Sequence, residues 1–114
     1  MKKTLLRFCK GPGELVILGL LIKGPMHGYQ IVRTLCEPAK RVIYVLCMGE
    51  GTLYPLLHRL EKKGFINGQW VKVGDKRKQR HYNITPKGRR EYAWLLQRWT
   101  SLAKAVHKVC AGAV

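Results

Sequence analysis

The spacing of apolar residues predicts that helices make up most of this chain. In the stretch 49–64, leucines recur at positions i, i+3, i+4 and i+7, which is the spacing of a helix with one apolar face. These leucines are Leu53, Leu56, Leu57 and Leu60. We predict Thr52 as the N-cap of this helix and Gly64 as its C-terminal stop. The opposite face is small at its start, aromatic in its middle and basic towards its end: Gly51, Tyr54, Pro55, His58, Arg59 and Lys62.

The segments before this helix are less uniform. Residues 14–22 are apolar nearly all round, which predicts a central helix, and the glycines and proline at 11–13 are expected to break any helix before it. A further helix is predicted from His27 to about residue 37. His27 is either a ligand, a cap or a packed imidazole, and the cap and the packed imidazole are favoured over the ligand because no partner ligand lies nearby in sequence. The apolar run 42–48 predicts either a short strand or a hydrophobic linker covered in a dimer.

The segments after it predict a hairpin and a long helix. Residues 65–73 and 79–85 look like two strands around a basic turn at 74–78. Thr85 and Pro86 are expected at the N-cap and first position of the last helix. That helix carries a heptad-like apolar seam, whose expected partner is the same helix of a second copy, and folding back on its own domain is the alternative. The seam consists of Tyr92, Leu95, Leu96, Trp99, Leu102, Val106 and Val109.

Composition narrows the class of partner. The chain has 114 residues and a net charge of +16, so we expect one folded domain that binds a polyanion. Nucleic acid is the first candidate and an anionic membrane surface the second. We find no secretory signal and no apolar run long enough to cross a bilayer. The four cysteines form no C-x-x-C pair, so we expect reduced thiols in a cytoplasmic protein.

An enzyme is the least favoured class. Asp75 is the only aspartate and Ser101 the only serine, and neither paired carboxylates nor a nucleophile elbow is present. His107 and Cys110 stand three positions apart, which is a weak metal signal that two ordinary helix residues explain better. We therefore expect no catalytic residue, no metal and no cofactor.

The order of the segments is that of a winged helix-turn-helix, mainly α with a small β-hairpin. We expect a basic N-terminal arm at 1–12, a DNA-binding domain at 13–85 and a dimerisation helix at 86–114. Tyr54 and His58 are the expected base readers, with Arg59 and Lys62 nearer the phosphates. The hairpin would contact the DNA backbone through Lys76, Arg77, Lys78 and Arg80.

The chain resembles the PadR-type transcriptional regulators. The resemblance rests on residues 14–21, Gly-Pro-Met-His-Gly-Tyr at 24–29, Gly-Thr-Leu-Tyr-Pro at 51–55 and residues 84–89. It implies a homodimeric repressor that binds a palindromic double-stranded operator, with DNA contacts around Thr52, Tyr54, Pro55 and His58. It also implies that the chain belongs to a compact subgroup whose members have a single C-terminal helix. By this resemblance Trp99 is the candidate contact for a small aromatic effector.

A non-specific nucleic-acid-binding protein is the alternative function. A chromosome-packaging or RNA-binding protein would have a similar charge, but RNA recognition usually shows several aromatic side chains exposed on a sheet. Only Trp70 and Tyr82 are available for that role in the expected hairpin.

Overall fold

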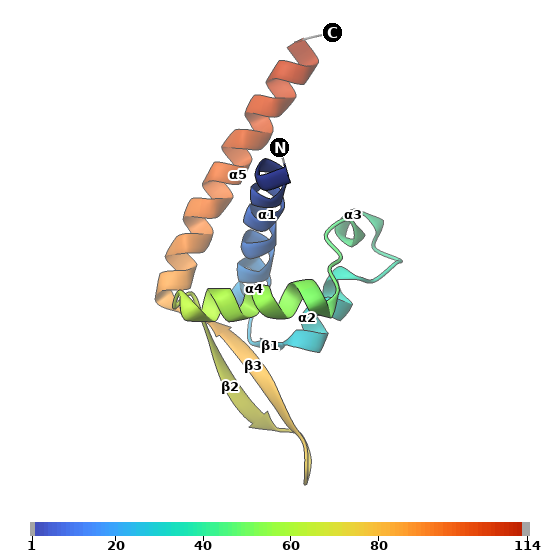
Figure 1. Ribbon diagram of the computed structural model, residues 1–114, viewed down its shortest axis with the longest axis vertical. Helices are drawn as coiled ribbons and strands as arrows, with labels where there is room; N and C mark the ends of the chain where they lie inside the picture. Colours follow the sequence, from blue (N-terminus) through green and yellow to red (C-terminus); the bar gives the residue numbers. More distant parts are fainter. Residues whose placement is uncertain (1, 113–114) are drawn as a thin grey trace.

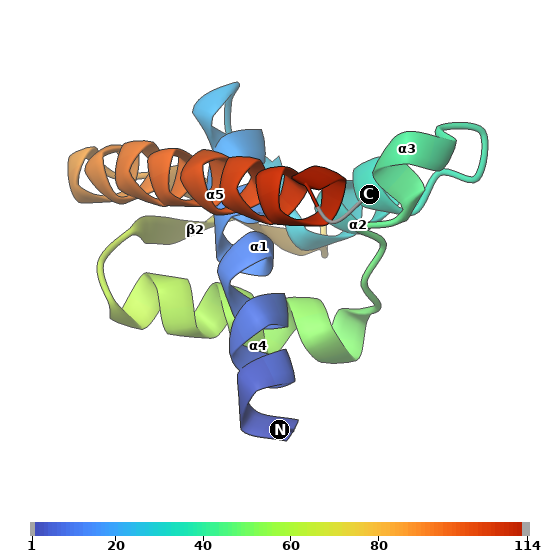
Figure 2. The ribbon, with the colours of Figure 1, turned by 90° about the horizontal axis from the view of Figure 1, so that it is seen from above.

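The computed structural model describes residues 2–112, with side chains described from residue 12 onward. Helix α5 packs against α1 and crosses it at an angle in the view from above (Figure 2), α4 lies across the lower end of α1, and a long hairpin projects below α4 (Figure 1). The structure confirms a mainly helical fold with a small hairpin and a long C-terminal helix. The elements are α1 (Lys2–Ile22), β1 (Met26–His27), α2 (Gly28–Leu35), α3 (Arg41–Tyr44), α4 (Glu50–Lys62), β2 (Ile66–Lys72), β3 (Lys78–Ile84) and α5 (Pro86–Gly112).

The leucine face of α4 lies in the centre of the core, as its spacing predicts. Leu53, Leu57 and Leu60 are fully buried, and they pack with the inner faces of α1 and α2. The central position expected for residues 14–22 is also confirmed. The core cluster comprises Ile17, Leu18, Leu21, Ile31, Leu35, Leu53, Leu56, Leu57, Leu60, Ile66 and Tyr82.

The sheet is small and antiparallel, with the strand order β1-β3-β2. In the hairpin, Trp70 pairs with Arg80 and Lys72 pairs with Lys78, while β1 places His27 opposite His81. The strands begin and end within a residue or two of the predicted ranges. The hairpin extends beyond the helices, so most of its surface remains open to a partner (Figure 1).

The predicted start of the last helix is confirmed by its cap. The hydroxyl of Thr85 accepts a hydrogen bond of 3.0 Å from the backbone N–H of Gly88. The same hydroxyl lies 2.7 Å from the carbonyl oxygen of Gly64, to which it donates. Thr85 therefore both starts α5 and ties it to the turn that ends α4.

The predicted break at residues 11–13 is wrong, because α1 runs continuously through Pro12. A proline removes one backbone hydrogen bond, but packing further along the helix can offset that loss. At Gly13, α1 comes so close to α4 that a Cβ atom there would lie 3.1 Å from Leu56 Cδ2. The basic side chains of the expected arm at 1–12 all precede the first side chain that the structure describes, so their contact with DNA stays a prediction.

The predicted N-cap of α4 is also wrong. The helix begins at Glu50 with Gly49 as its N-cap, and no side chain supplies a capping hydrogen bond. The carbonyl oxygen of Gly49 accepts bonds from the N–H groups of Thr52 (3.1 Å) and Leu53 (2.9 Å). Thr52 thus lies in the first turn, and Pro55 lies within the helix.

The segment after α2 differs most from its prediction. The expected strand at 42–48 is wrong, since the residues form the short helix α3 and an exposed loop, with Val42 89% exposed. Coverage of this segment by a second copy stays a prediction. The prediction of reduced thiols is wrong for two cysteines, because Cys36 and Cys47 form a disulfide. The pair stands 11 residues apart, a spacing that carries no sequence signature.

Replacement of Gly88 by Ala should destabilise the fold strongly. An ideal Cβ atom at Gly88 would lie 2.0 Å from the carbonyl oxygen of Phe65, so the backbone itself would have to move. We expect Gly88→Ala to lower the free energy of unfolding by about 3 kcal/mol. Gly112→Ala in the same helix is the control, because a Cβ atom there meets nothing within 4 Å. Equal urea midpoints for the two variants would contradict the close approach.

Candidate nucleic-acid interface

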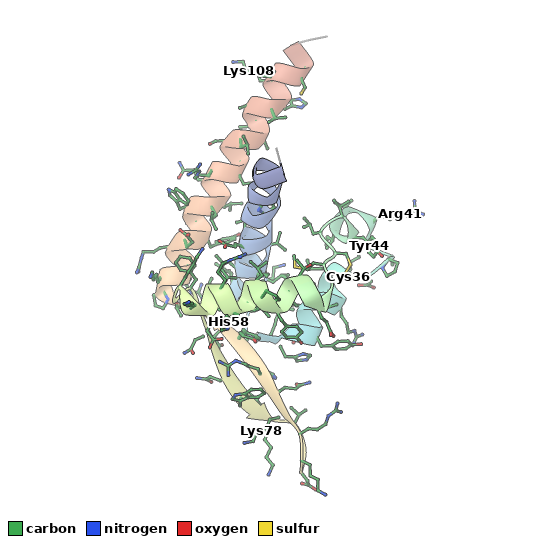
Figure 3. The ribbon with its side chains drawn as sticks, in the orientation of Figure 1. Cys36, Arg41, Tyr44, His58, Lys78 and Lys108 are labelled. Atoms are coloured by element: carbon green, nitrogen blue, oxygen red, sulfur yellow. A yellow bond between two sulfur atoms is a disulfide. The ribbon has the colours of Figure 1, made fainter. Side chains whose placement is uncertain are left out.

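The outer face of α4 is open to solvent, as a DNA-reading helix requires. Tyr54 is 43% exposed, and His58 and Lys62 are exposed beside it. At the start of the helix Gly51, Thr52 and Pro55 are exposed too. Figure 3 shows α4 above the hairpin, with His58 labelled on α4 and Lys78 on the hairpin.

Arg59 is held differently from its neighbours. Its guanidinium Nε lies 3.4 Å from a carboxylate oxygen of Glu14, which also pairs with Lys63 at 3.4 Å. Arg59 is half-buried, so α1 positions its side chain at the edge of the exposed face. A cation already paired with a carboxylate contributes less to phosphate binding than a free one.

Tyr54 is positioned by a close approach between α4 and α2. An ideal Cβ atom at Gly28 would lie 2.7 Å from the phenolic oxygen of Tyr54. A side chain at position 28 would collide with this ring, so the glycine permits the close approach. The Tyr54 ring rests on the first turn of α2 and still presents part of its surface to solvent.

Arg80 connects the hairpin to α4. Its guanidinium lies 2.5 Å from a carboxylate oxygen of Glu61 and stacks over the Trp70 ring at 5.4 Å. The guanidinium also lies 5.9 Å from the centre of the Tyr82 ring, and burial is the main cause that raises the pKa of the Tyr82 phenol. Sequence reasoning missed the pairing with Glu61, because the two residues come from different elements 19 positions apart.

The junction of α4 and the hairpin is hollowed. One hollow of about 680 Å³ includes Tyr54, His58 and Lys62 in its lining, and its floor includes the Arg80–Glu61 pair. A second hollow of about 460 Å³ continues past Tyr54 to Trp70 and Lys78. The candidate base readers of α4 and the first cation of β3 thus line neighbouring parts of one concave surface.

The tip of the hairpin is a basic projection. Lys76, Arg77 and Lys78 are exposed, and Asp75 is the one acid among them. Within the part of the chain that the structure describes, these three cations take part in none of the ion pairs. Unpaired cations on a narrow ribbon are well suited to contact phosphate groups.

The α5 seam divides into two parts. Tyr92 and Leu95 pack against the core of their own domain, and the Tyr92 ring lies against Gly19 of α1. Further along, α5 extends past the end of α1 (Figure 1). The exposed apolar residues are Trp94, Leu96, Trp99, Leu102, Val106 and Val109.

Residues 2–112 show little evidence of a metal site or of a membrane-spanning helix. No cluster of three or more metal-ligating side chains occurs in the described part of the chain. None of the helices described is long and apolar enough to cross a bilayer. His27 acts as a cap: its Nδ1 accepts a hydrogen bond of 3.1 Å from the N–H of Gln30 at the start of α2.

Comparisons with known proteins agree with this geometry. Residues 17–94 match the model of the "Transcriptional regulator PadR-like family". A transcriptional regulator from Clostridium thermocellum superposes with a TM-score of 0.78 and 28% identity, covering 90% of this chain and 96% of that one. A PadR-like transcription factor from Bacteroides fragilis has a TM-score of 0.74 and 32% identity, covering 94% and 96% of the two chains.

One similar structure contains DNA. Bacillus subtilis PadR in complex with operator DNA superposes with a TM-score of 0.65 and 29% identity. The match covers 73% of this chain and 46% of that one.

Acid should weaken the fold through His27. Burial, and secondarily the nearby His81, lowers the pKa of His27 below 6.5, and protonation would also remove the Nδ1 acceptor that caps α2. As the pH falls, the unfolded chain binds this proton at a higher pH than the folded chain does. The stability that neutral His27 contributes is therefore present above about pH 6.5 and is lost as the pH falls through the folded pKa.

His27→Asn is the matched control, since Asn also caps helices but does not titrate. Between about pH 8 and pH 5 we expect the free energy of unfolding to fall more for the wild type than for His27→Asn. Urea unfolding at both pH values measures this difference, and parallel losses would show that His27 does not contribute.

Proposed function

Because the chain belongs to the transcriptional regulator PadR-like family, we propose that it is a homodimeric, sequence-specific DNA-binding repressor. One observation supports this function most directly. The leucine face of α4 is buried, so the face with Tyr54 and His58 is exposed directly beside a basic hairpin. As PadR-like regulators are transcription factors, the chain is not an enzyme.

In the proposed complex α4 lies in the major groove. Its start includes Gly51, Thr52 and Pro55, which are small enough for close approach. Tyr54 and His58 read base edges from the middle of the helix. Lys62 contacts a phosphate group. Arg59 also contacts a phosphate group, while its guanidinium stays paired with Glu14.

The hairpin supplies backbone contacts through its tip. Lys76, Arg77 and Lys78 bind phosphates, which gives affinity without sequence information. Arg80 positions the hairpin for DNA binding, because its ion pair with Glu61 and its stacking on Trp70 fix the hairpin relative to α4. The tip and the groove helix then reach the duplex together.

The outer part of α5 pairs with a second copy. Trp99, Leu102 and Val106 form an exposed apolar strip where α5 passes beyond its own domain, and such strips mark interfaces. Two copies joined in this way would present two α4 helices to half-sites about one duplex turn apart on a palindromic operator. A small aromatic effector would bind at this interface against Trp99 and relieve repression.

Removal of the cations at the hairpin tip should weaken all DNA binding alike. In Lys76→Ala/Arg77→Ala/Lys78→Ala we expect lower affinity for a selected palindromic duplex and for random DNA, with their ratio unchanged. The slope of log affinity against log salt should fall by about 0.9 for each lost phosphate contact. Titrations at several salt concentrations measure both quantities.

The control is Lys104→Ala/Lys108→Ala, which removes two cations of α5. Lys108 lies at the opposite end of the molecule from Lys78 (Figure 3). This variant should keep the salt slope of the wild type. An unchanged slope in the tip variant would contradict the proposed contacts. A wild-type affinity ratio near one between palindromic and random DNA would favour the non-specific nucleic-acid binder instead.

A charge in the seam should separate the dimer. In Leu102→Glu a carboxylate would be buried between two apolar helices, so we expect the dimer dissociation constant to rise by about 100-fold. Gln97→Glu introduces the same side chain on the opposite face of α5 and should leave dimerisation unchanged. Sedimentation of each variant at micromolar concentrations shows whether it is a dimer or a monomer. A monomeric wild type would refute the proposed dimer.

A further inference from the structure

The Cys36–Cys47 disulfide joins two elements next to the proposed reading helix. Cys36 is the C-cap of α2 and packs against the core, while Cys47 is exposed and lies two residues before Gly49, the N-cap of α4. The bond therefore ties the approach to α4 onto the fixed end of α2 (Figure 3).

Little else holds the intervening segment. Residues 37–47 are all exposed, and their hydrogen bonds and their ion pair, Lys40–Glu37, stay within the segment as far as the structure describes the chain. Met48 is the next residue to pack on the core, and its carbonyl oxygen lies 3.5 Å from Cys36 Sγ. A disulfide sulfur has no proton to donate, so this is a packing contact rather than a hydrogen bond.

The first turn of α4 has little stability of its own. Its N-cap Gly49 offers no side-chain acceptor, Gly51 lowers the helix propensity of this turn, and Pro55 lowers that of the next. Leu53 is the first residue of α4 that the core holds in place. The position of residues 49–52, where α4 would enter the groove, thus depends on what precedes them.

From this arrangement we propose that Cys36 and Cys47 are a reversible thiol–disulfide site that controls DNA binding. With the bond formed, the first turn of α4 is held ready for the groove. With the bond reduced, residues 37–49 gain freedom that DNA binding must remove again, so affinity falls. This proposal rests on the DNA-binding function proposed above.

The exposure of Cys47 makes the exchange chemically accessible. The thiolate of a low-molecular-weight dithiol attacks Cys47 Sγ, a mixed disulfide forms, and Cys36 leaves as a thiolate that takes up a proton. Arg33 lines the same surface hollow as Cys36, and a nearby cation stabilises a leaving thiolate.

The second thiol of the reagent then attacks the mixed disulfide and releases Cys47. In the balance, the protein disulfide gains two electrons and two protons, and the dithiol becomes a cyclic disulfide. A low-molecular-weight disulfide reverses the process by the same exchange steps.

The test uses the full chain with Cys9→Ser and Cys110→Ser, so that Cys36 and Cys47 are the remaining cysteines. Thiol titration should find no free thiol after treatment with a low-molecular-weight disulfide and two after treatment with a dithiol. The DNA probe is a duplex selected from a random library with the oxidised protein, and a scrambled duplex is the comparison.

We expect reduction to weaken binding to the selected duplex by about tenfold, and re-oxidation to restore it. Amide hydrogen exchange without DNA should become faster at residues 49–52 on reduction and stay unchanged in β2. Cys47→Ser, at an exposed position, should behave like the reduced protein under both treatments, and far-ultraviolet circular dichroism should show that it is folded.

The outcomes separate the two proposals. Equal affinities of the oxidised and reduced protein, or equal exchange at residues 49–52, would overturn the thiol–disulfide site and leave the DNA-binding function standing. Two free thiols after oxidation would overturn it as well. If the library yields no preferred duplex, the sequence-specific function fails, while the exchange experiment still tests the effect of the bond on α4.

Discussion

Burial of the leucine face of α4 is the constraint on which the surface of this protein depends. Leu53, Leu57 and Leu60 are removed from water against α1 and α2, and each contributes about 1.5–3 kcal/mol. A rotation of α4 about its axis would expose these leucines and bury a histidine, a lysine or a proline instead. The same interaction that stabilises the core therefore determines which side chains face outward. The chemistry of the exposed face is a consequence of how the opposite face packs.

The hairpin depends on α4 in turn. A two-stranded ribbon is marginal by itself, and this one extends well beyond the helices (Figure 1). Its base is held by Ile66 and Tyr82 in the core, and its middle is held by Arg80, whose guanidinium lies between Glu61 and Trp70. Gly68 leaves the space for that guanidinium, because a Cβ atom there would lie 2.6 Å from Arg80 Nε. The tip remains without such contacts, so its cations stay available.

The sequence predicts those features that depend on a local pattern. The leucine spacing in α4, the Thr85–Pro86 start of α5 and the two strands around the basic turn each carry their signal within a few residues, and each is confirmed. The features that it does not predict depend on contacts distant in sequence. The continuity of α1 through Pro12 follows from packing against α4, the pairing of Arg80 follows from the placement of Glu61, and the disulfide follows from the turn between α2 and α4. The N-cap of α4 likewise falls at Gly49 rather than Thr52.

The high net charge of the chain favours a dimer interface that is apolar and lies far from the DNA-binding surface. Each chain carries +16, so two chains together carry +32 (16 + 16) and repel each other unless the interface is apolar and the cations lie apart. At physiological ionic strength, charges more than about 8 Å apart are largely screened. The molecule is 62 Å long, and the hairpin and the outer half of α5 occupy its opposite ends (Figure 1). A dimer formed through Trp99, Leu102 and Val106 would therefore keep its hairpin cations far from the contact. Bound DNA would then neutralise those cations at the other end, so that the two kinds of association do not compete for the same surface.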